Sequence, residues 1–176
     1  MKWYFYPKLP MKCGICPLSV KNTGALTMFY GEYRHTVDEK SRLSIPSRFR
    51  TLLVGDGNDK FYLTRGLDKH LLLCTTTKWQ ELETKFTKHS LTNAAARNFK
   101  RAFYSGAGEV TFDKQGRIAI PPTLLEYAEI RREVVIVGVS DAIEIWDADK
   151  WSKSIGSLLE NFGQAAEELE KGSNEK

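Results

Sequence analysis

The chain has 176 residues, of which 41% are hydrophobic and 27% charged, a composition typical of one globular domain or two small ones. Its formal net charge of +4 comes from residues 1–27, which carry four lysines and no acidic side chain, so bulk charge alone indicates no nucleic-acid partner. No apolar run approaches the roughly 20 residues that a membrane-spanning helix needs, so we expect a cytoplasmic protein without a membrane partner.

Residues 1–27 show no helical or strand periodicity. The aromatic run at residues 3–6 is followed by prolines and lysines, which makes a poor signal-peptide core. We expect either an extension that the fold does not need or a start of translation at Met28, because termini that are not tied down are usually dispensable.

The three cysteines and the other chemistry-bearing residues form no recognisable reactive site. Cys13 and Cys16 form a lone CxxC pair, and Cys74 makes the number odd, so no disulfide framework is predicted. A structural zinc site needs four ligands, and the histidines are scattered. No phosphate-binding glycine loop, nucleophile elbow or metal-ligand pair of histidines is present. We therefore expect no enzyme, catalytic residue, metal, cofactor or small-molecule substrate.

From Met28 the chain alternates like a strand through residues 31–37, turns at residues 38–41 and returns as a strand over residues 42–45. Pro46 then favours the first turn of a short helix with Phe49, Leu52 and Leu53 on its apolar face. A second hairpin is predicted from residues 61–63 with residues 71–73. This first segment therefore has the order β-β-α-β-β.

Two helices are predicted next. A capping-box pattern from Thr77 to Gln80 favours a helix over residues 77–86, and Thr92 or Asn93 begins another that runs through Phe103. Three basic residues share one face of the second helix because they are three or four residues apart. They are Arg97, Lys100 and Arg101. Such a face is more often simply solvated than a phosphate site.

The second β-β-α-β-β segment starts with strands at residues 110–112 and 118–120, which flank a turn at residues 113–116. Gly116 can supply the positive φ that such a turn usually requires. Ser41 stands in its place in the first turn, so we expect that turn to be of a different type or mildly strained. A short helix follows with Leu124, Leu125 and Ala128 on its apolar face, then a hairpin of residues 134–137 with 143–146.

Asp147 is a good N-cap for a last helix with a long apolar stripe. The stripe consists of Trp151, Ile155, Leu158, Leu159, Phe162 and Leu169. An apolar stripe of this kind has to pack against another surface, so we expect it to contact a neighbouring subunit.

The two segments are copies of one unit. The pattern Asp-x-x-x-Arg-apolar-x-Ile-Pro occurs at residues 38–46 and again at residues 113–121, and Trp79 is matched by Trp151. An internal repeat fixes the architecture more strongly than any local motif. We therefore predict an α+β, β-rich protein in which two β-β-α-β-β units pack as a pseudo-dimer with appended helices. Both tryptophans are expected to be core anchors.

The repeated motif leaves two interpretations open. Asp38 with Arg42 and Asp113 with Arg117 are either structural pairs that pin the turns or parts of a nucleic-acid contact, and both roles are compatible. Residues 34–50 carry a surplus of basic side chains, and further lysines lie in the turns. The candidate contacts are Arg34, Lys40, Arg42, Lys114 and Arg117.

The chain resembles a known family in these motifs together. The family-like features are residues 28–33, the two Asp-x-x-x-Arg motifs, the pattern Arg-x-x-Lys-Arg-Ala-Phe-x-x-Gly-Ala at residues 97–107, and the paired tryptophans. They are similar to MraZ, bacterial regulators of the division and cell-wall gene cluster built from tandem SpoVT-AbrB domains. The resemblance runs from Met28 to about Phe162. Residues 1–27 have no counterpart in it, and Ser41 replaces the usual glycine.

The resemblance implies a swapped-hairpin, AbrB-like double-split β-barrel and ring-like homo-oligomers. It places the first SpoVT-AbrB domain at residues 32–79, a helical connector at 80–106, the second domain at 107–150, and a C-terminal helix with an acidic tail at 151–176. It also implies a repressor in the nucleoid that binds short direct repeats of double-stranded DNA near its own promoter. Arg42 and Arg117 would contact the DNA. The alternative is a protein-interaction module of antitoxin-like type.

Overall fold

The computed structural model of the protein describes residues 28–54, 60–88 and 93–173. The predicted extension at residues 1–27, including Cys13 and Cys16, lies outside the described residues. Among the described residues, no helix is both long and apolar enough to cross a membrane.

Both copies fold with the predicted order of two strands, one helix and two strands. The elements of the first copy are β1 (Phe29–Thr36), β2 (Arg42–Ser44), α1 (Ser47–Val54), β3 (Phe61–Arg65) and β4 (Leu71–Thr75). The helices α2 (Thr76–Thr87) and α3 (Ala94–Tyr104) follow. The second copy comprises β5 (Gly108–Val110), β6 (Arg117–Ala119), α4 (Pro122–Ala128), β7 (Glu133–Ser140) and β8 (Ile143–Asp147). The described chain ends with α5 (Ala148–Glu160) and α6 (Phe162–Ser173).

Three of the helix N-termini show which capping predictions were right. The side chains of Asn93 and Asp147 accept backbone hydrogen bonds at the starts of α3 and α5, which confirms both predicted caps. The helix predicted from Thr77 is present as α2, but its predicted cap was wrong, because the helix is capped by Thr75, whose hydroxyl accepts from the backbone N of Lys78 at 3.2 Å. Thr75 ends β4 with the extended backbone that an N-cap requires, so the helix begins before Thr77.

The strands of the two copies interleave in one antiparallel sheet with the order β1-β7-β8-β4-β3-β5. The predicted second hairpins, β3 with β4 and β7 with β8, are confirmed. At both edges a strand of one copy pairs with a strand of the other, β1 with β7 and β3 with β5. The strand expected at residues 110–112 lies earlier, because β5 ends at Val110, where its pairing with Phe61 ends.

The first predicted hairpin of each copy is wrong in its pairing. β2 does not return along β1 beyond a single bridge from Val37 to Leu43. Instead β2 pairs with β6 of the other copy as a separate two-stranded ribbon, in which Leu43 lies opposite Ile118. Both side chains are completely buried. These strands have three residues each, too few for backbone pairing to decide the partner, so burial of the two apolar side chains decides it.

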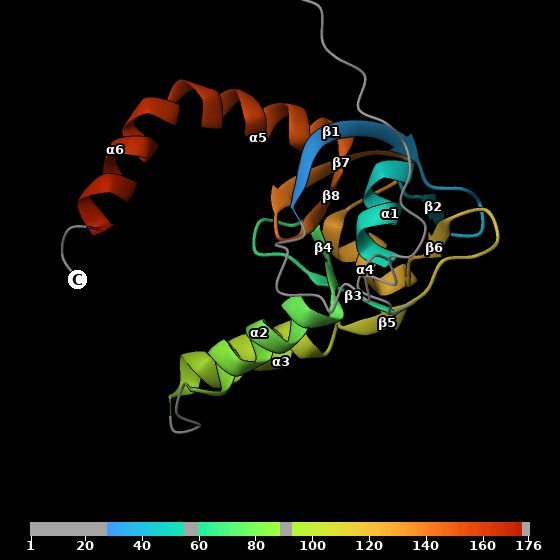
Figure 1. Ribbon diagram of the computed structural model, residues 1–176, viewed down its shortest axis with the longest axis horizontal. Coiled ribbons are helices and arrows are strands. Elements are labelled where there is room, and N and C mark those ends of the chain that lie inside the picture. Colours follow the sequence, from blue (N-terminus) through green and yellow to red (C-terminus); the bar gives the residue numbers. More distant parts are fainter. Residues whose placement is uncertain (1–27, 55–59, 89–92, 174–176) are drawn as a thin grey trace, which may run out of the picture.

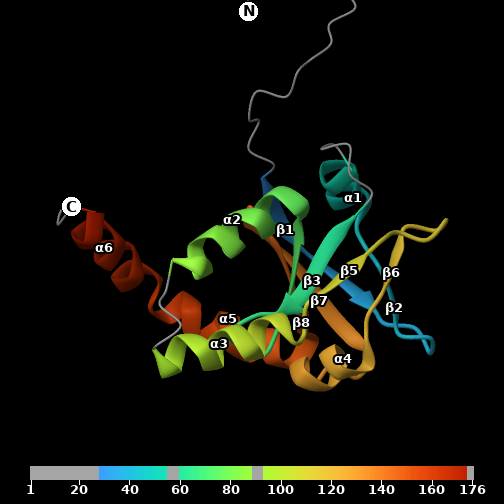
Figure 2. The same ribbon diagram turned by 90° about the horizontal axis from the view of Figure 1, so that it is seen from below.

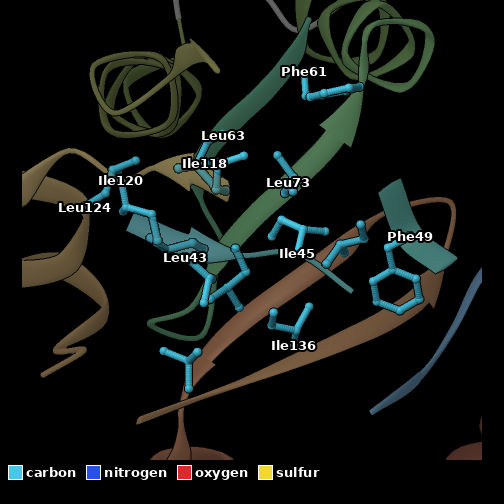
Figure 3. Close-up of a cluster of buried hydrophobic side chains, with 14 of the residues drawn as sticks. Leu43, Ile45, Phe49, Phe61, Leu63, Leu73, Ile118, Ile120, Leu124 and Ile136 are labelled. Carbon is cyan, nitrogen blue, oxygen red and sulfur yellow. The ribbon is translucent and has the colours of Figure 1, made fainter. Parts of the chain in front are cut away.

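The main core lies between this ribbon, the six-stranded sheet and the helices α1 and α4. Figure 3 shows side chains from both copies converging there, and all of the labelled ones are buried. They include Leu43, Ile45 and Phe49 from the first copy and Ile118, Ile120 and Leu124 from the second. Neither copy therefore has a complete core of its own.

The two matched tryptophans are buried, as predicted, but they anchor clusters beside the main core. Trp79 on α2 forms stacked ring pairs with Tyr62 of β3 and with Phe103 of α3. Trp151 on α5 packs against Trp146, and its indole N–H donates to the Oε2 of Glu32 at 2.9 Å. Each tryptophan thus fastens an appended helix to the sheet.

The appended helices and the two repeated turns point to different ends of the molecule. In Figures 1 and 2 the turns at residues 38–41 and 113–116 extend from the β2–β6 ribbon at the right. The α2–α3 hairpin and the α5–α6 helices extend in other directions, with α6 at the opposite end from the turns. The turns are therefore accessible to a partner that the helices do not contact.

Candidate nucleic-acid interface

The first turn is organised by the carboxylate of Asp38. Its Oδ1 accepts from the backbone N of Lys40 and of Arg42, each at 2.9 Å. Its Oδ2 accepts from the Nε of Arg42 at 2.8 Å and lies 2.7 Å from the Nη2. The backbone N of Ser41 donates to the Asp38 carbonyl at 2.9 Å and closes the turn. One aspartate therefore shapes the backbone and also fixes the guanidinium of the arginine.

The second turn has the same construction around Asp113. Its Oδ1 accepts from the backbone N of Gln115 at 2.8 Å and of Arg117 at 3.0 Å. Its Oδ2 accepts from the Nε of Arg117 at 2.8 Å and lies 2.7 Å from the Nη2. The backbone N of Gly116 donates to the Asp113 carbonyl at 2.9 Å. The two motifs are thus equivalent in structure as well as in sequence.

The closing residues of the two turns share a left-handed backbone, with a φ of 57° at Ser41 and 74° at Gly116. The expectation of a different turn type at Ser41 was therefore wrong. The other expectation, mild strain, agrees with the positive φ of Ser41. A left-handed conformation costs a residue with a Cβ about 1–2 kcal/mol. The hydrogen bonds of the Asp38 carboxylate offset this cost.

Each arginine stabilises the ionised form of the aspartate that holds it. Hydrogen bonds from Arg42 hold the pKa of Asp38 below its usual range, and those from Arg117 lower the pKa of Asp113 to about 2. Both aspartates are therefore ionised at neutral pH. The four side chains are about one quarter to one third exposed, so the ion pairs fix geometry more than they add stability.

The two turns are also joined to each other. The Nη1 of Arg117 lies 3.6 Å from the Oδ2 of Asp38, which places the second arginine beside the first aspartate. The backbone N of Ile45 donates to the Gly116 carbonyl at 3.2 Å, and the N of Ile120 donates to the Ser41 carbonyl at 2.8 Å. The structure therefore brings Arg42 and Arg117 together beside Asp38.

The other candidate residues are placed differently. Lys40 and Lys114 are exposed in the turns but do not occupy matching positions, since Lys40 corresponds to Gln115. Arg34 lies on β1 and lines a separate hollow of about 460 Å³ with Glu133 and Ala148. The structure does not bring Arg34 together with the two motif arginines in any contact that it records among the described residues.

Sequence reasoning missed two contacts beside the turns. Arg50 on α1 lies against Gly116 of the other copy's turn, where a Cβ would come within 2.6 Å of its Cζ. The carbonyl of Arg132, after α4, accepts from the backbone N of Val37 at 2.8 Å, next to the first turn. Both contacts follow from the interleaving of the copies. In the sequence, Arg50 was indicated only by the surplus of basic side chains over residues 34–50.

The arrangement suits an anionic partner. Arg42 is held at Nε and Nη2 and still has the two N–H groups of its Nη1. A guanidinium fixed in this way can bind a phosphate or the O6 and N7 atoms of guanine. Among the described residues, no group of three histidine, cysteine, aspartate or glutamate side chains gathers in a way that could hold a metal ion.

Comparisons with known proteins show what the chain is similar to. A sequence model of the MraZ family, described as "MraZ protein, putative antitoxin-like", matches the chain twice, at residues 28–102 and 103–171. The curated transcriptional regulator MraZ of Halothermothrix orenii is 46% identical over 143 residues. The match covers 81% of this chain and 97% of that protein. The similarity therefore extends over nearly the whole length of that relative.

Proposed function

The chain belongs to the MraZ family, a family of transcriptional regulators rather than enzymes, and we propose that it is a sequence-specific DNA-binding regulator. We propose that it represses the division and cell-wall gene cluster from short direct repeats near its own promoter, in the cytoplasm and nucleoid. The observation that carries the proposal is the pair of joined turns, each with an arginine fixed by an aspartate.

The proposed division of labour follows from the geometry. Arg42 and Arg117 contact DNA through guanidinium groups whose direction the aspartates have already set, so binding costs little side-chain entropy. Lys40 and Lys114 add phosphate contacts from the exposed turns, and Arg34 contributes charge from the adjoining strand. Asp38 and Asp113 position the arginines and do not contact DNA.

We propose that the fold is the swapped-hairpin, AbrB-like double-split β-barrel. The cross-copy pairings β2 with β6, β1 with β7 and β3 with β5 support this classification. The proposed domains remain residues 32–79 and 107–150, joined by the connector at 80–106 and followed by residues 151–176. The interleaved strands predict that neither domain folds without the other.

A ring-like homo-oligomer is the proposed binding form. The apolar stripe of α5 and α6 begins at the buried Trp151 and continues into solvent, where Leu158, Leu159 and Phe162 are 56%, 65% and 71% exposed. One pair of turns contacts few bases, so several subunits on tandem sites would raise affinity through effective concentration. Light scattering should show an oligomer, and Leu159→Ser with Phe162→Ser should dissociate it and weaken operator binding. A monomer that binds DNA tightly would contradict this.

The alternative is a protein-interaction module, which the family's description as antitoxin-like favours. In that case the arginines of the turns would meet an acidic protein surface in place of DNA. DNA binding has a signature that such a module lacks, a linear fall of log K with log salt whose slope counts the phosphates contacted.

The test is a salt titration of binding to the DNA immediately upstream of the gene, with shuffled DNA of the same composition as the control. The proposal expects tighter binding to the upstream DNA at every salt concentration and a steep salt dependence on both sequences. Equal affinity for upstream and shuffled DNA, or no binding at low salt, would favour the interaction module.

A further inference from the structure

Arg50 occupies a position that the repeated motifs do not explain. It belongs to α1 of the first copy, but its side chain lies over the turn of the second copy. The Cδ, Cζ and Nη1 of Arg50 all lie where a side chain on Gly116 would begin. The residue after Gly116 is Arg117, so two arginines from different copies meet at this turn.

The electrostatics of Arg50 differ from those of the motif arginines. Arg42 and Arg117 each have a carboxylate at 2.7 Å, whereas no carboxylate of the described residues lies within ion-pair distance of Arg50. Its Nε is buried and has no hydrogen-bond partner there. An external anion cannot reach the buried Nε itself. The side chain is only half-buried, however, and a guanidinium without a carboxylate is suited to an anion that binds from outside the chain.

The first turn has no matching arginine. In the alignment of the two motifs, Leu125 of α4 corresponds to Arg50, and it packs against the main core. Ser41 corresponds to Gly116 and carries the Cβ that the second turn has no room for. The unpaired charge is therefore present at one turn alone, and the surface formed by the two turns is asymmetric.

We propose that Arg50 is a third arginine of the DNA-binding surface and contacts a backbone phosphate beside the second turn. This inference rests on the proposed DNA-binding function. A phosphate is the group that a guanidinium without a carboxylate would bind, and a phosphate contact carries no base information. Arg50 thus positions the second turn on the duplex and adds affinity on any sequence. Glycine at position 116 leaves room for this side chain.

The test compares Arg50→Leu with Arg48→Leu in the full chain, on upstream and shuffled DNA from 50 to 200 mM salt. Leucine is the residue that the second copy has at this position, so the fold should tolerate it. Arg48 is a matched control, because it lies on the same helix, stacked 3.9 Å over the ring of Tyr30. Both variants remove one positive charge.

For Arg50→Leu we expect a salt slope shallower by about 0.9, which is about three- to fourfold less change in affinity over this range. The preference for upstream DNA and the melting temperature should be retained, and Arg48→Leu should keep the wild-type slope. A purely structural role would not move the slope. If Arg50→Leu does not fold, Arg50→Gln provides the same measurement with a polar side chain.

A folded Arg50 variant with the wild-type slope and affinity would overturn the proposal, and so would an equal change of slope in Arg48→Leu. In those cases the proposed function survives if Arg42→Ala with Arg117→Ala still loses upstream binding. If the wild-type protein does not prefer the upstream DNA, the proposed function fails and this inference fails with it.

Discussion

The two Asp-x-x-x-Arg turns have the same hydrogen bonds but close with different residues, Ser41 in one and Gly116 in the other. Because Ser41 adopts the left-handed backbone, the turn itself does not require glycine. The aspartate carboxylate, which accepts two backbone N–H groups in each turn, is what shapes it. Glycine at position 116 serves a neighbour instead, because Arg50 lies where its side chain would be.

Among exchanges of the residues that close the two turns, Gly116→Ser should change the stability of the protein most. The serine would meet the left-handed strain and would also overlap Arg50. We expect a loss of about 1–3 kcal/mol in the free energy of unfolding, measured by urea denaturation. Combining Gly116→Ser with Arg50→Leu should recover part of the loss, because the overlap is then removed. Strictly additive effects would show that Arg50 does not occupy the space above Gly116.

The reverse exchange, Ser41→Gly, should have a smaller effect of opposite sign. Relief of the left-handed backbone gains about 1–2 kcal/mol, and the extra freedom of glycine in the unfolded chain costs about 0.4–1 kcal/mol. We expect a net stabilisation of about 0.5 kcal/mol, seen as a small rise in melting temperature. Marked destabilisation would mean that the Ser41 side chain has a structural role in the first turn.

The titration of the aspartates should reveal an ion-pair contact that the two turns do not share. Arg117 pairs with Asp113 and also approaches Asp38, whereas Arg42 has a recorded ion pair with Asp38 alone. Arg117→Ala should therefore raise the pKa of Asp113 and, to a lesser extent, that of Asp38, while Arg42→Ala should raise that of Asp38 only. Carboxyl-carbon NMR titrations of the variants measure both. Equal shifts of Asp113 in the two variants would contradict the asymmetry.

The same pKa values set the direction of the pH dependence. The folded pKa of Asp113, about 2, lies below the ordinary 3.8, so its pair with Arg117 stabilises the protein above about pH 4. That contribution is lost as the pH falls from about 4 toward 2. The lowered pKa of Asp38 acts in the same direction. Asp113→Asn should therefore lower stability at neutral pH and flatten its dependence on pH in that window.

Much of this structure was predictable from local sequence. The duplicated motif predicted the repeat and its β-β-α-β-β order, and Asn93 and Asp147 predicted two helix starts. The pairing of β2 with β6 was not predictable from the strands themselves, since three residues carry too little pattern to choose a partner. Leu43 and Ile118 meet because the two copies share one core.

The candidate site likewise has one part that the sequence predicted and another part that it did not. Asp38 with Arg42 and Asp113 with Arg117 are four residues apart, so their contacts are local and the motif indicated them. The contact of Arg50 with Gly116 spans the two copies and depends on their interleaving. Arg34 is close to the first turn in sequence, but in the structure it lines a different hollow.

The central claim is that the two joined turns bind DNA through Arg42 and Arg117. The most direct test is the affinity of the Arg42→Ala, Arg117→Ala double variant for the upstream DNA, at one fixed salt concentration and alongside the wild type. Circular dichroism and light scattering establish that the variant keeps its fold and its oligomeric state. We predict that its preference for upstream over shuffled DNA disappears. A folded double variant that binds upstream DNA like the wild type would contradict the claim.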